Sequence, residues 1–470
     1  MRSIKSLSIL LTLCLSSVIT KAQSDIMYFM NETPQSSFIN PAFGTKLGNY
    51  ISLPALSGID FTFNTSGFSY HNIIHKHPVY TDSLQVDAEG FFNKLKSSNY
   101  LNTQFNTNLF GIGFTFGRNH ISFDLNLSMN TRLGLEKSLI GFILYGTENE
   151  NKGLIYDEPL LNADIYFSPS ISFAHDFGDK LTVGTRVGML FGWLDITSKK
   201  TEVSAISENG TLQIQSNIDV LTSNAIGKLS STSFLNDAID FTTNGVSQMF
   251  SDSFKNRGGV IDLGATYKIN DNMQVSAAVT DLGFIRWRTN STAIRSSHPN
   301  HSVEFNGISS TLDSLSNDLE AYVEQLGDTL NYIFDMKTED IDSYVSMIPT
   351  KLYLGYTWQF IPSMYLHALY KGIGGNGYWD SYFSLYYSLH WKALALSVGN
   401  TFSKGTALNP SFAFSVTGGG FNLYLGGSFA ANKVSFNVGD FTGANVFLGI
   451  NIMIGSRRPY WTSNPEIPVL

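Results

Sequence analysis

The chain has 470 residues, of which 43% are hydrophobic, 13% are aromatic and only 14% are charged. Soluble domains usually carry about a quarter charged residues, and disordered chains avoid aromatic residues. The composition therefore speaks against both an ordinary soluble enzyme and a disordered chain. The formal net charge of −8 argues against a nucleic-acid partner.

Residues 1–22 have the pattern of a cleaved signal peptide, which predicts export to the cell envelope. Arg2 and Lys5 precede an apolar stretch of about 13 residues, which is shorter than a transmembrane helix requires. The small-x-small pattern ends at Ala22, where we expect cleavage. The single cysteine, Cys14, lies inside this leader, so we expect a mature chain without disulfides, thiolate metal sites or a cysteine nucleophile.

Residues 23–48 form an N-terminal segment that precedes the first predicted strand. Its Asn40-Pro41 pair disfavours a helix before the proline. Two interpretations remain open. The pair is either a simple entry turn into the first strand or part of a plug that fills the interior of a barrel.

Residues 49–455 contain stretches in which apolar and polar side chains alternate, the pattern of strands with one apolar face. Phe383, Leu385 and Tyr387, for example, share one face of a predicted strand. We expect about 14 strands, with 12 or 16 as alternatives, because bacterial single-chain barrels prefer even numbers. The strand-like segments are 49–70, 100–117, 120–134, 162–177, 180–198, 258–269, 272–288, 350–360, 363–371, 380–391, 393–404, 408–418, 420–431 and 444–455.

The apolar face of these strands points either into a soluble sandwich core or outward into lipid. Lipid is favoured because the chain is exported and because the strands have about 9–11 residues, the length that a tilted transmembrane strand needs. Aromatic residues also cluster near strand ends, as in interfacial girdles. Only helices and closed barrels satisfy every backbone group in hydrocarbon. The predicted fold is therefore all-β, a transmembrane antiparallel β-barrel in the outer membrane.

Two insertions, 199–256 and 289–348, and a C-terminal tail, 456–470, depart from the strand pattern. In the second insertion, apolar residues at three- and four-residue spacing predict a helix over 311–336. We expect this helix to pack on the barrel rim or mouth. A partner-binding helix is the alternative.

Two related Asp-Leu-Gly motifs lie in the strands expected over 258–269 and 272–288. Their shared odd-numbered apolar residues predict a hairpin with the turn Asn270-Asp271-Asn272, in which Ile269 pairs with Met273 and Asp262 pairs with Thr280 on the lumenal face. The motif residues are Asp262, Gly264 and Tyr267 in the first strand, and Asp281, Gly283 and Trp287 in the second.

Asp281 has the odd number of the lipid-facing residues and lies about ten residues from the turn. We therefore expect it at the outer rim of the apolar band, where a charge costs little. A bulge at Gly283 would instead turn it inward. Arg286 and Arg288 are its nearest candidate partners. We expect a structural role for this motif, and contact with a ligand or partner is the alternative.

These motifs, together with SSFINPAF from Ser36 to Phe43 and PTKL from Pro349 to Leu352, resemble a family of Bacteroidota outer-membrane barrels of unknown function. They resemble, more distantly, the PorP/SprF-type and PorV-type proteins of type IX secretion and gliding. Those proteins belong with the long-chain fatty-acid-transporter-like barrels. The resemblance implies a barrel of about 14 strands with an N-terminal segment inside. The two insertions and the C-terminal tail depart from the family pattern.

The resemblance implies a non-enzymatic accessory or scaffold subunit of a cell-envelope machine, such as type IX secretion or gliding. The alternative is an outer-membrane transporter or channel for a hydrophobic small molecule such as a fatty acid. We expect no cofactor, no metal and no catalytic residue, and the expected partners are outer-membrane lipids and either other envelope proteins or a hydrophobic ligand. The candidate plug or structural residues are Asn40, Pro41, Asp262, Gly264, Tyr267, Asp281, Gly283 and Trp287.

Overall fold

The computed structural model describes most of the chain. The predicted signal peptide, the tail 456–470 and most of the helix expected over 311–336 lie outside the described residues. These residues are 26–76, 84–145, 154–156, 161–208, 211–225, 251–296, 301–303, 334, 336–375, 378–403, 409–431 and 437–455.

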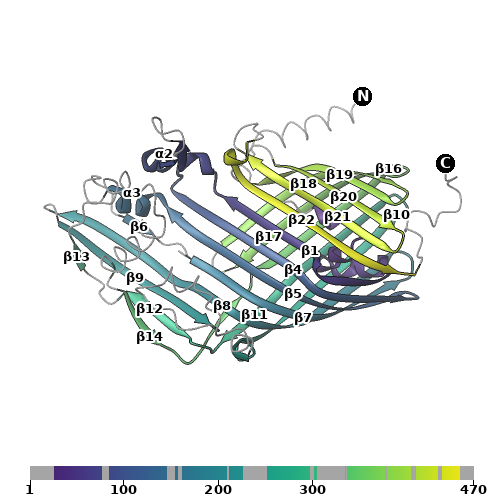
Figure 1. The fold of residues 1–470 in the computed structure, drawn as a ribbon, viewed down its shortest axis with the longest axis horizontal. Coiled ribbons are helices and arrows are strands. Elements are labelled where there is room, and N and C mark those ends of the chain that lie inside the picture. Colours follow the sequence, from purple (N-terminus) through teal and green to yellow (C-terminus); the bar gives the residue numbers. More distant parts are fainter. Residues whose placement is uncertain are drawn as a thin grey trace.

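Fourteen long antiparallel strands among the described residues close into a barrel (Figure 1). Closure comes from β1, which pairs with β22 on one side and with β4 on the other. The number of strands and their antiparallel order confirm the predicted architecture. Around the barrel, the strands are β1 (Asn49–Thr65), β4 (Ser98–Phe116), β5 (Asn119–Glu136), β7 (Leu161–Phe177), β8 (Leu181–Glu208), β10 (Arg257–Asn270), β11 (Met273–Trp287), β16 (Thr350–Ile361), β17 (Met364–Gly375), β18 (Tyr378–Trp391), β19 (Leu394–Ser403), β20 (Pro410–Gly418), β21 (Phe421–Ala431) and β22 (Phe441–Ile454).

Shorter elements gather at one end of the barrel, where Figure 1 shows α2 and α3 beside β6, β9 and β13. The predicted insertion 199–256 begins with the end of β8, which runs for 28 residues and pairs with β9 beyond the barrel wall. The opposite end carries the short turns between strands. The shorter elements are η4 (Tyr70–Asn72), β2 (Ile74–Lys76), β3 (Leu84–Val86), α2 (Ala88–Lys94), α3 (Lys137–Tyr145), β6 (Leu154–Tyr156), β9 (Thr211–Asn224), β12 (Thr292–Ser296), β13 (His301–Val303), β14 (Met336–Asp340), β15 (Tyr344–Met347) and η6 (Val438–Asp440).

The alternation of side chains separates an apolar outside from a mixed inside. In β18, Phe383 and Leu385 are exposed on the outer face, whereas Ser384 and Tyr386 are buried in the interior. An apolar outer band on a closed sheet is the surface that a transmembrane barrel presents to lipid. Among the helices of the described residues, none has the length and apolarity to cross a membrane.

Residues 26–47 lie inside the barrel, where Figure 1 shows them in purple toward the end with short turns. We call them the lumenal segment. It consists of three 3-10 helices, η1 (Ile26–Phe29), η2 (Pro34–Phe38) and η3 (Pro41–Lys46). Its turn hydrogen bonds close within the segment, as between the Met30 N–H and the Met27 carbonyl. The segment is therefore a compact body inside the barrel rather than an additional strand of its wall.

Candidate functional site

The lumenal segment separates two cavities. The mouth cavity, of about 620 Å³, lies at the end with short turns and is bordered by the segment and by turn residues such as Asp271 and Gly419. The inner cavity, of about 170 Å³, lies on the far side of the segment and is bordered by Asp60, Arg186 and Lys351 of the wall. Any solute passing through the lumen would have to move past this segment.

Aromatic side chains seat the lumenal segment against the wall. Tyr28 stacks on Tyr353 of β16 with ring centroids 5.6 Å apart, and it meets Phe43 of η3 edge to face at 5.1 Å. Phe29 stacks on His367 of β17 at 4.2 Å. Burial raises the pKa of Tyr28 to about 12, so its hydroxyl stays protonated at physiological pH. Apolar burial thus favours the seated position of the segment.

Gln35 of η2 makes several polar contacts with the wall. Its amide exchanges hydrogen bonds with the amide of Asn451 in β22, at 3.0 and 2.9 Å, and donates to the Ser57 carbonyl of β1 at 3.0 Å. The pairing of β1 with β22 is irregular beside this contact, between Ser52 and Ser57. Gln35 therefore fastens the segment at the seam where the barrel closes.

Asn40 and Pro41, the expected turn or plug residues, lie buried within the lumenal segment. The Asn40 side chain caps η3 by accepting the Ala42 N–H at 3.0 Å, and its amide donates to the Tyr28 hydroxyl at 3.2 Å. The amide also lies 3.4 Å from the Ala277 carbonyl of β11. Asn40 therefore both shapes the segment and ties it to the wall.

Gly264 lets the wall approach this pair closely. A Cβ atom added at Gly264 of β10 would lie 2.1 Å from Asn40 Oδ1 and 3.0 Å from Pro41 Cδ. At Gly184 of β8, an added Cβ would lie 2.4 Å from the carbonyl carbon of Pro41. We call the wall residues that contact the lumenal segment its seat. Gly264, the glycine of the first Asp-Leu-Gly motif, is one of them.

Asp262 of the same motif is buried and binds Arg186. Asp262 Oδ2 accepts the Arg186 Nε–H at 2.5 Å, and the Arg186 Nη2 group donates to the Phe38 carbonyl of the lumenal segment at 2.8 Å. Asp262 Oδ1 accepts the backbone N–H of Asp281 at 2.6 Å. One buried ion pair therefore links the segment to β8, β10 and β11.

The expectation that Asp281 lies at the lipid-facing rim is wrong. In β11 a β-bulge places both Thr280 and Asp281 opposite Asp262, and Asp281 has a φ of 61°. The extra residue turns Asp281 toward the lumen, where its carboxylate binds Lys351 at 2.8 Å. Asp tolerates this left-handed conformation better than most residues. The partner is thus Lys351 rather than the expected arginines, and the bulge lies at Asp281 rather than at Gly283.

The hairpin turn is also tighter than predicted. Asn270 pairs with Met273 across two turn residues, and an irregularity between Lys268 and Asn270 replaces the expected Ile269–Met273 pair. The inner register is nevertheless the expected one as far as Leu263 opposite Val279.

The remaining candidate residues have separate surroundings. Tyr267 is 45% exposed on the outer face, away from the lumen. Trp287 is fully buried, and its Nε1–H donates to the Ser346 hydroxyl at 2.7 Å. Gly283 faces the interior at a crowded point, because an added Cβ would lie 2.8 Å from the Gly259 carbonyl oxygen. The structure therefore brings Asn40, Pro41, Asp262, Gly264 and Asp281 together and leaves Tyr267 and Trp287 apart.

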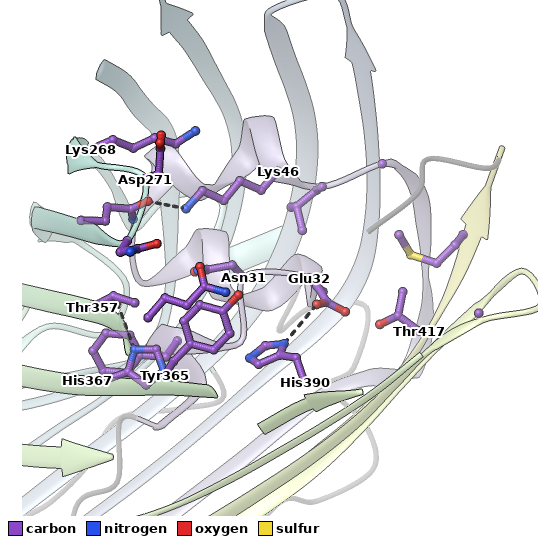
Figure 2. Close-up of a pocket in the computed structure, with 18 of the residues that line it drawn as sticks. Asn31, Glu32, Lys46, Lys268, Asp271, Thr357, Tyr365, His367, His390 and Thr417 are labelled. Carbon is purple, nitrogen blue, oxygen red and sulfur yellow. Dashed lines mark hydrogen bonds and ion pairs between the residues drawn. The ribbon is translucent and has the colours of Figure 1, made fainter. Parts of the chain in front are cut away.

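The mouth cavity carries charges of both signs. Figure 2 shows Lys46 beside Lys268 and Asp271 of the β10–β11 hairpin, and Glu32 facing His390 of β18. The Lys46 ammonium donates to Gln274 Oε1 at 3.2 Å. Burial and the neighbouring Lys268 charge lower the pKa of Lys46 to about 8.

Sequence reasoning missed several residues of this site. Arg186 is the single charged residue in the strand-like run TVGTRVGML, at a lumen-facing position, and that isolation was the available signal. Gln35 and Glu32 are polar residues in a segment treated only through its Asn-Pro pair. Their wall partners lie hundreds of residues away, as with Gln35 and Asn451, so no local pattern identifies them.

Within the described part of the chain, no group of three His, Cys, Asp or Glu side chains could hold a metal ion. The lumen instead offers hydrogen-bonding side chains, paired charges and aromatic rings around two cavities.

Solved structures with a similar fold share little sequence with this chain. The Ralstonia pickettii toluene transporter TbuX is 12% identical over 89% of this chain and 94% of its own, with a TM-score of 0.43. The P. putida toluene transporter TodX is 12% identical over 89% and 93%, with a TM-score of 0.42. A Pseudomonas aeruginosa FadL homologue is 10% identical over 90% and 94%, with a TM-score of 0.39.

Comparison with curated proteins found no match. Residues 41–427 match the family of unknown function DUF5723. This match covers most of the chain, from the proline of the lumenal segment to β21, and the protein therefore belongs to the DUF5723 family.

Proposed function

We propose that the protein is a gated passage for small molecules across the outer membrane, with the lumenal segment as the gate. The observation that carries this proposal is the position of the segment between the mouth cavity and the inner cavity. A separate body inside the lumen, with a cavity on each side, is the arrangement that a gated passage requires.

The attachment of the segment suits a movable part. Side chains such as Gln35, Asn40 and Arg186 make its polar contacts with the wall, and each such hydrogen bond contributes about 0.5–1.5 kcal/mol net. The wall strands are joined by continuous backbone ladders. A solute that binds the displaced segment better than the seated one shifts the equilibrium between them. The segment would therefore move long before the wall opens.

The lining of the lumen favours a polar or amphipathic solute over a pure hydrocarbon. Asp60, Arg186, Asp262 and Lys351 all border the inner cavity. A purely apolar solute would displace water from these groups without replacing its hydrogen bonds, which costs free energy. We therefore narrow the expected hydrophobic ligand to one that carries polar groups.

The test is solute influx into liposomes that contain the purified protein. Gln35→Ala removes the amide that fastens the segment to Asn451 and Ser57, and we expect faster influx of a small polar solute. The matched control is Asn256→Ala, because the Asn256 amide donates to the Gly192 carbonyl at 3.1 Å and borders neither cavity. Equal influx through wild type and both variants would contradict the gate.

A second function, an accessory subunit of an envelope machine such as type IX secretion or gliding, draws on the resemblance to PorP/SprF-type proteins. The sheet formed by β8, β9, β12 and β14 projects beyond the barrel and offers a platform for a partner (Figure 1). Cross-linking in intact cells from Lys200 in this projection tests the idea. Recovery of the same adducts from a barrel-wall position would contradict it.

A further inference from the structure

The mouth cavity presents buried acceptor oxygens that receive no hydrogen bond. Among the described residues, none donates to Asn31 Oδ1 or to Glu32 Oε1. His390 Nδ1 lies 3.7 Å from Glu32 Oε1, which is within ion-pair distance when His390 is protonated but beyond hydrogen-bond distance (Figure 2). A buried acceptor without a donor costs about 1–3 kcal/mol, and more when it is charged. A ligand with N–H donors, above all an ammonium group, would remove this cost.

The same cavity presents positive charge at a second place. Lys46 and Lys268 both border it, and the Lys46 ammonium donates to Gln274 Oε1 at 3.2 Å. Burial and the charge of Lys268 make the protonated form of Lys46 less favourable and lower its pKa. An acid group bound here would stabilise both ammonium groups.

Apolar and aromatic side chains also line the cavity, which is large enough for an organic molecule. Its volume of about 620 Å³ falls in the range of about 300–1,000 Å³ that is typical of ligand sites. The apolar lining residues are Phe29, Leu47, Met273, Tyr365 and Met453.

We propose that the mouth cavity binds a zwitterionic organic molecule with an apolar body, of the class of short apolar peptides. Its ammonium group contacts Asn31 and Glu32, and its carboxylate contacts Lys46 and Lys268. A simple anion would meet the Glu32 carboxylate, and a simple cation would meet the two lysines, so one molecule with both charges fits best. This inference rests on the proposed function and names the substrate class of the gated passage.

Binding at this site would also engage the gate. Asn31, Glu32 and Lys46 belong to the lumenal segment, whereas Lys268 and Tyr365 belong to the wall. A ligand held between them contacts both parts, so its affinity differs between the seated and the displaced segment. Such a difference is what allows a ligand to shift a conformational equilibrium.

The test is calorimetric titration of the full chain in detergent micelles with L-leucyl-L-leucine. N-acetyl-leucyl-leucine lacks the ammonium group, and leucyl-leucinamide lacks the carboxylate. We expect each analogue to bind at least about tenfold more weakly, since each loses a charge-assisted hydrogen bond. Equal affinity for all three molecules, or no binding of leucyl-leucine at millimolar concentration, would overturn the proposal.

Glycerophosphoethanolamine distinguishes a peptide ligand from a lipid headgroup, because it carries both charges but lacks the apolar body. We expect it to bind more weakly than leucyl-leucine. Tighter binding would assign the site to a headgroup and overturn the peptide class.

Glu32→Gln tests whether Glu32 contacts the ammonium group of the ligand. We expect it to weaken leucyl-leucine binding about tenfold and to leave N-acetyl-leucyl-leucine unchanged. Glu339→Gln, at an exposed position on β14, is the matched control. Unchanged leucyl-leucine binding by Glu32→Gln contradicts the assignment. Binding in micelles needs no passage through the barrel, so failure here and failure of the gate remain distinguishable.

Discussion

Gly264→Ala tests the seat of the lumenal segment with a single methyl group. The added Cβ would lie 2.1 Å from Asn40 Oδ1, whereas ordinary contacts begin near 3.4 Å, so the two must separate by about 1.3 Å. Pro41 Cδ would also lie 3.0 Å away, so a movement of the Asn40 side chain alone would leave a second tight contact with the segment. The variant and the present seat of the segment are therefore incompatible.

The magnitude follows from the hydrogen bonds of Asn40. Only the hydrogen bond to the Ala277 carbonyl joins Asn40 to the wall, because its bonds to Ala42 and Tyr28 lie within the lumenal segment. Loss of the bond to Ala277 costs about 0.5–1.5 kcal/mol. Such a cost shifts the equilibrium between seated and displaced segment by roughly two- to tenfold.

The assay is solute influx into liposomes, together with the rate at which added protease cleaves residues 26–47 in detergent. We expect both rates to rise in Gly264→Ala. Gly259→Ala is the matched control on the same strand, because its Cβ would meet nothing closer than 3.9 Å. The double variant with Asn40→Ala should show the same rates as Asn40→Ala alone, since that change already removes both the clashing oxygen and the bond to Ala277. Wild-type influx and cleavage rates in Gly264→Ala would refute the reasoning.

Two further predictions concern stability in detergent, measured as the midpoint of heat denaturation. Trp287→Phe should lower the free energy of unfolding by about 1–3 kcal/mol, because it leaves the buried Ser346 hydroxyl without its indole donor. The control Trp391→Phe, at a position 63% exposed, should leave the midpoint unchanged. Equal midpoints for the two variants would contradict this prediction. Burial lowers the pKa of Lys46 to about 8 from its ordinary 10.5, so between these values the native chain binds fewer protons than the unfolded chain, and this group adds stability as pH rises. Lys46→Met removes this unfavourable buried charge, so its gain in stability should be largest below about pH 8 and should narrow toward pH 10.5. A gain that does not vary with pH would contradict the buried charge.

The strands were predictable because each residue of a barrel wall faces either lipid or lumen. This choice constrains every second side chain, and it appears in the sequence as alternation that needs no distant information. The strand expected over 380–391, for example, corresponds to β18 (Tyr378–Trp391).

The prediction that Asp281 faces lipid, made from its odd residue number, failed because it assumes that the strand pairing is unbroken. The bulge there depends on Asp262, which lies on the neighbouring strand and accepts the Asp281 N–H. One extra residue reverses the facing of every position that follows, which is why Trp287 lies inside despite its odd number.

The contacts between the lumenal segment and its seat could not be predicted from sequence periodicity, for a related reason. Gln35 meets Asn451 across 416 residues of chain, and that contact exists only after the barrel closes. The Asn40-Pro41 pair predicted a turn, but the glycine that receives it, Gly264, is identified only by the distances between them.

The most direct test of the gate is to lock it. An ideal Cβ at Gly44 of η3 lies 3.4 Å from the Ala174 Cβ of β7, close to the separation of about 3.5–4.5 Å in disulfides. An added Cβ at Gly44 would also lie 2.7 Å from His120 Cδ2, so the background carries His120→Ala together with Cys14→Ser and Gln35→Ala. In this background, Gly44→Cys with Ala174→Cys should form a disulfide between segment and wall. The single-cysteine variants control for the substitutions themselves. We predict that oxidation stops solute influx into liposomes and that reduction restores it, and the same influx before and after reduction would contradict a gate formed by the lumenal segment.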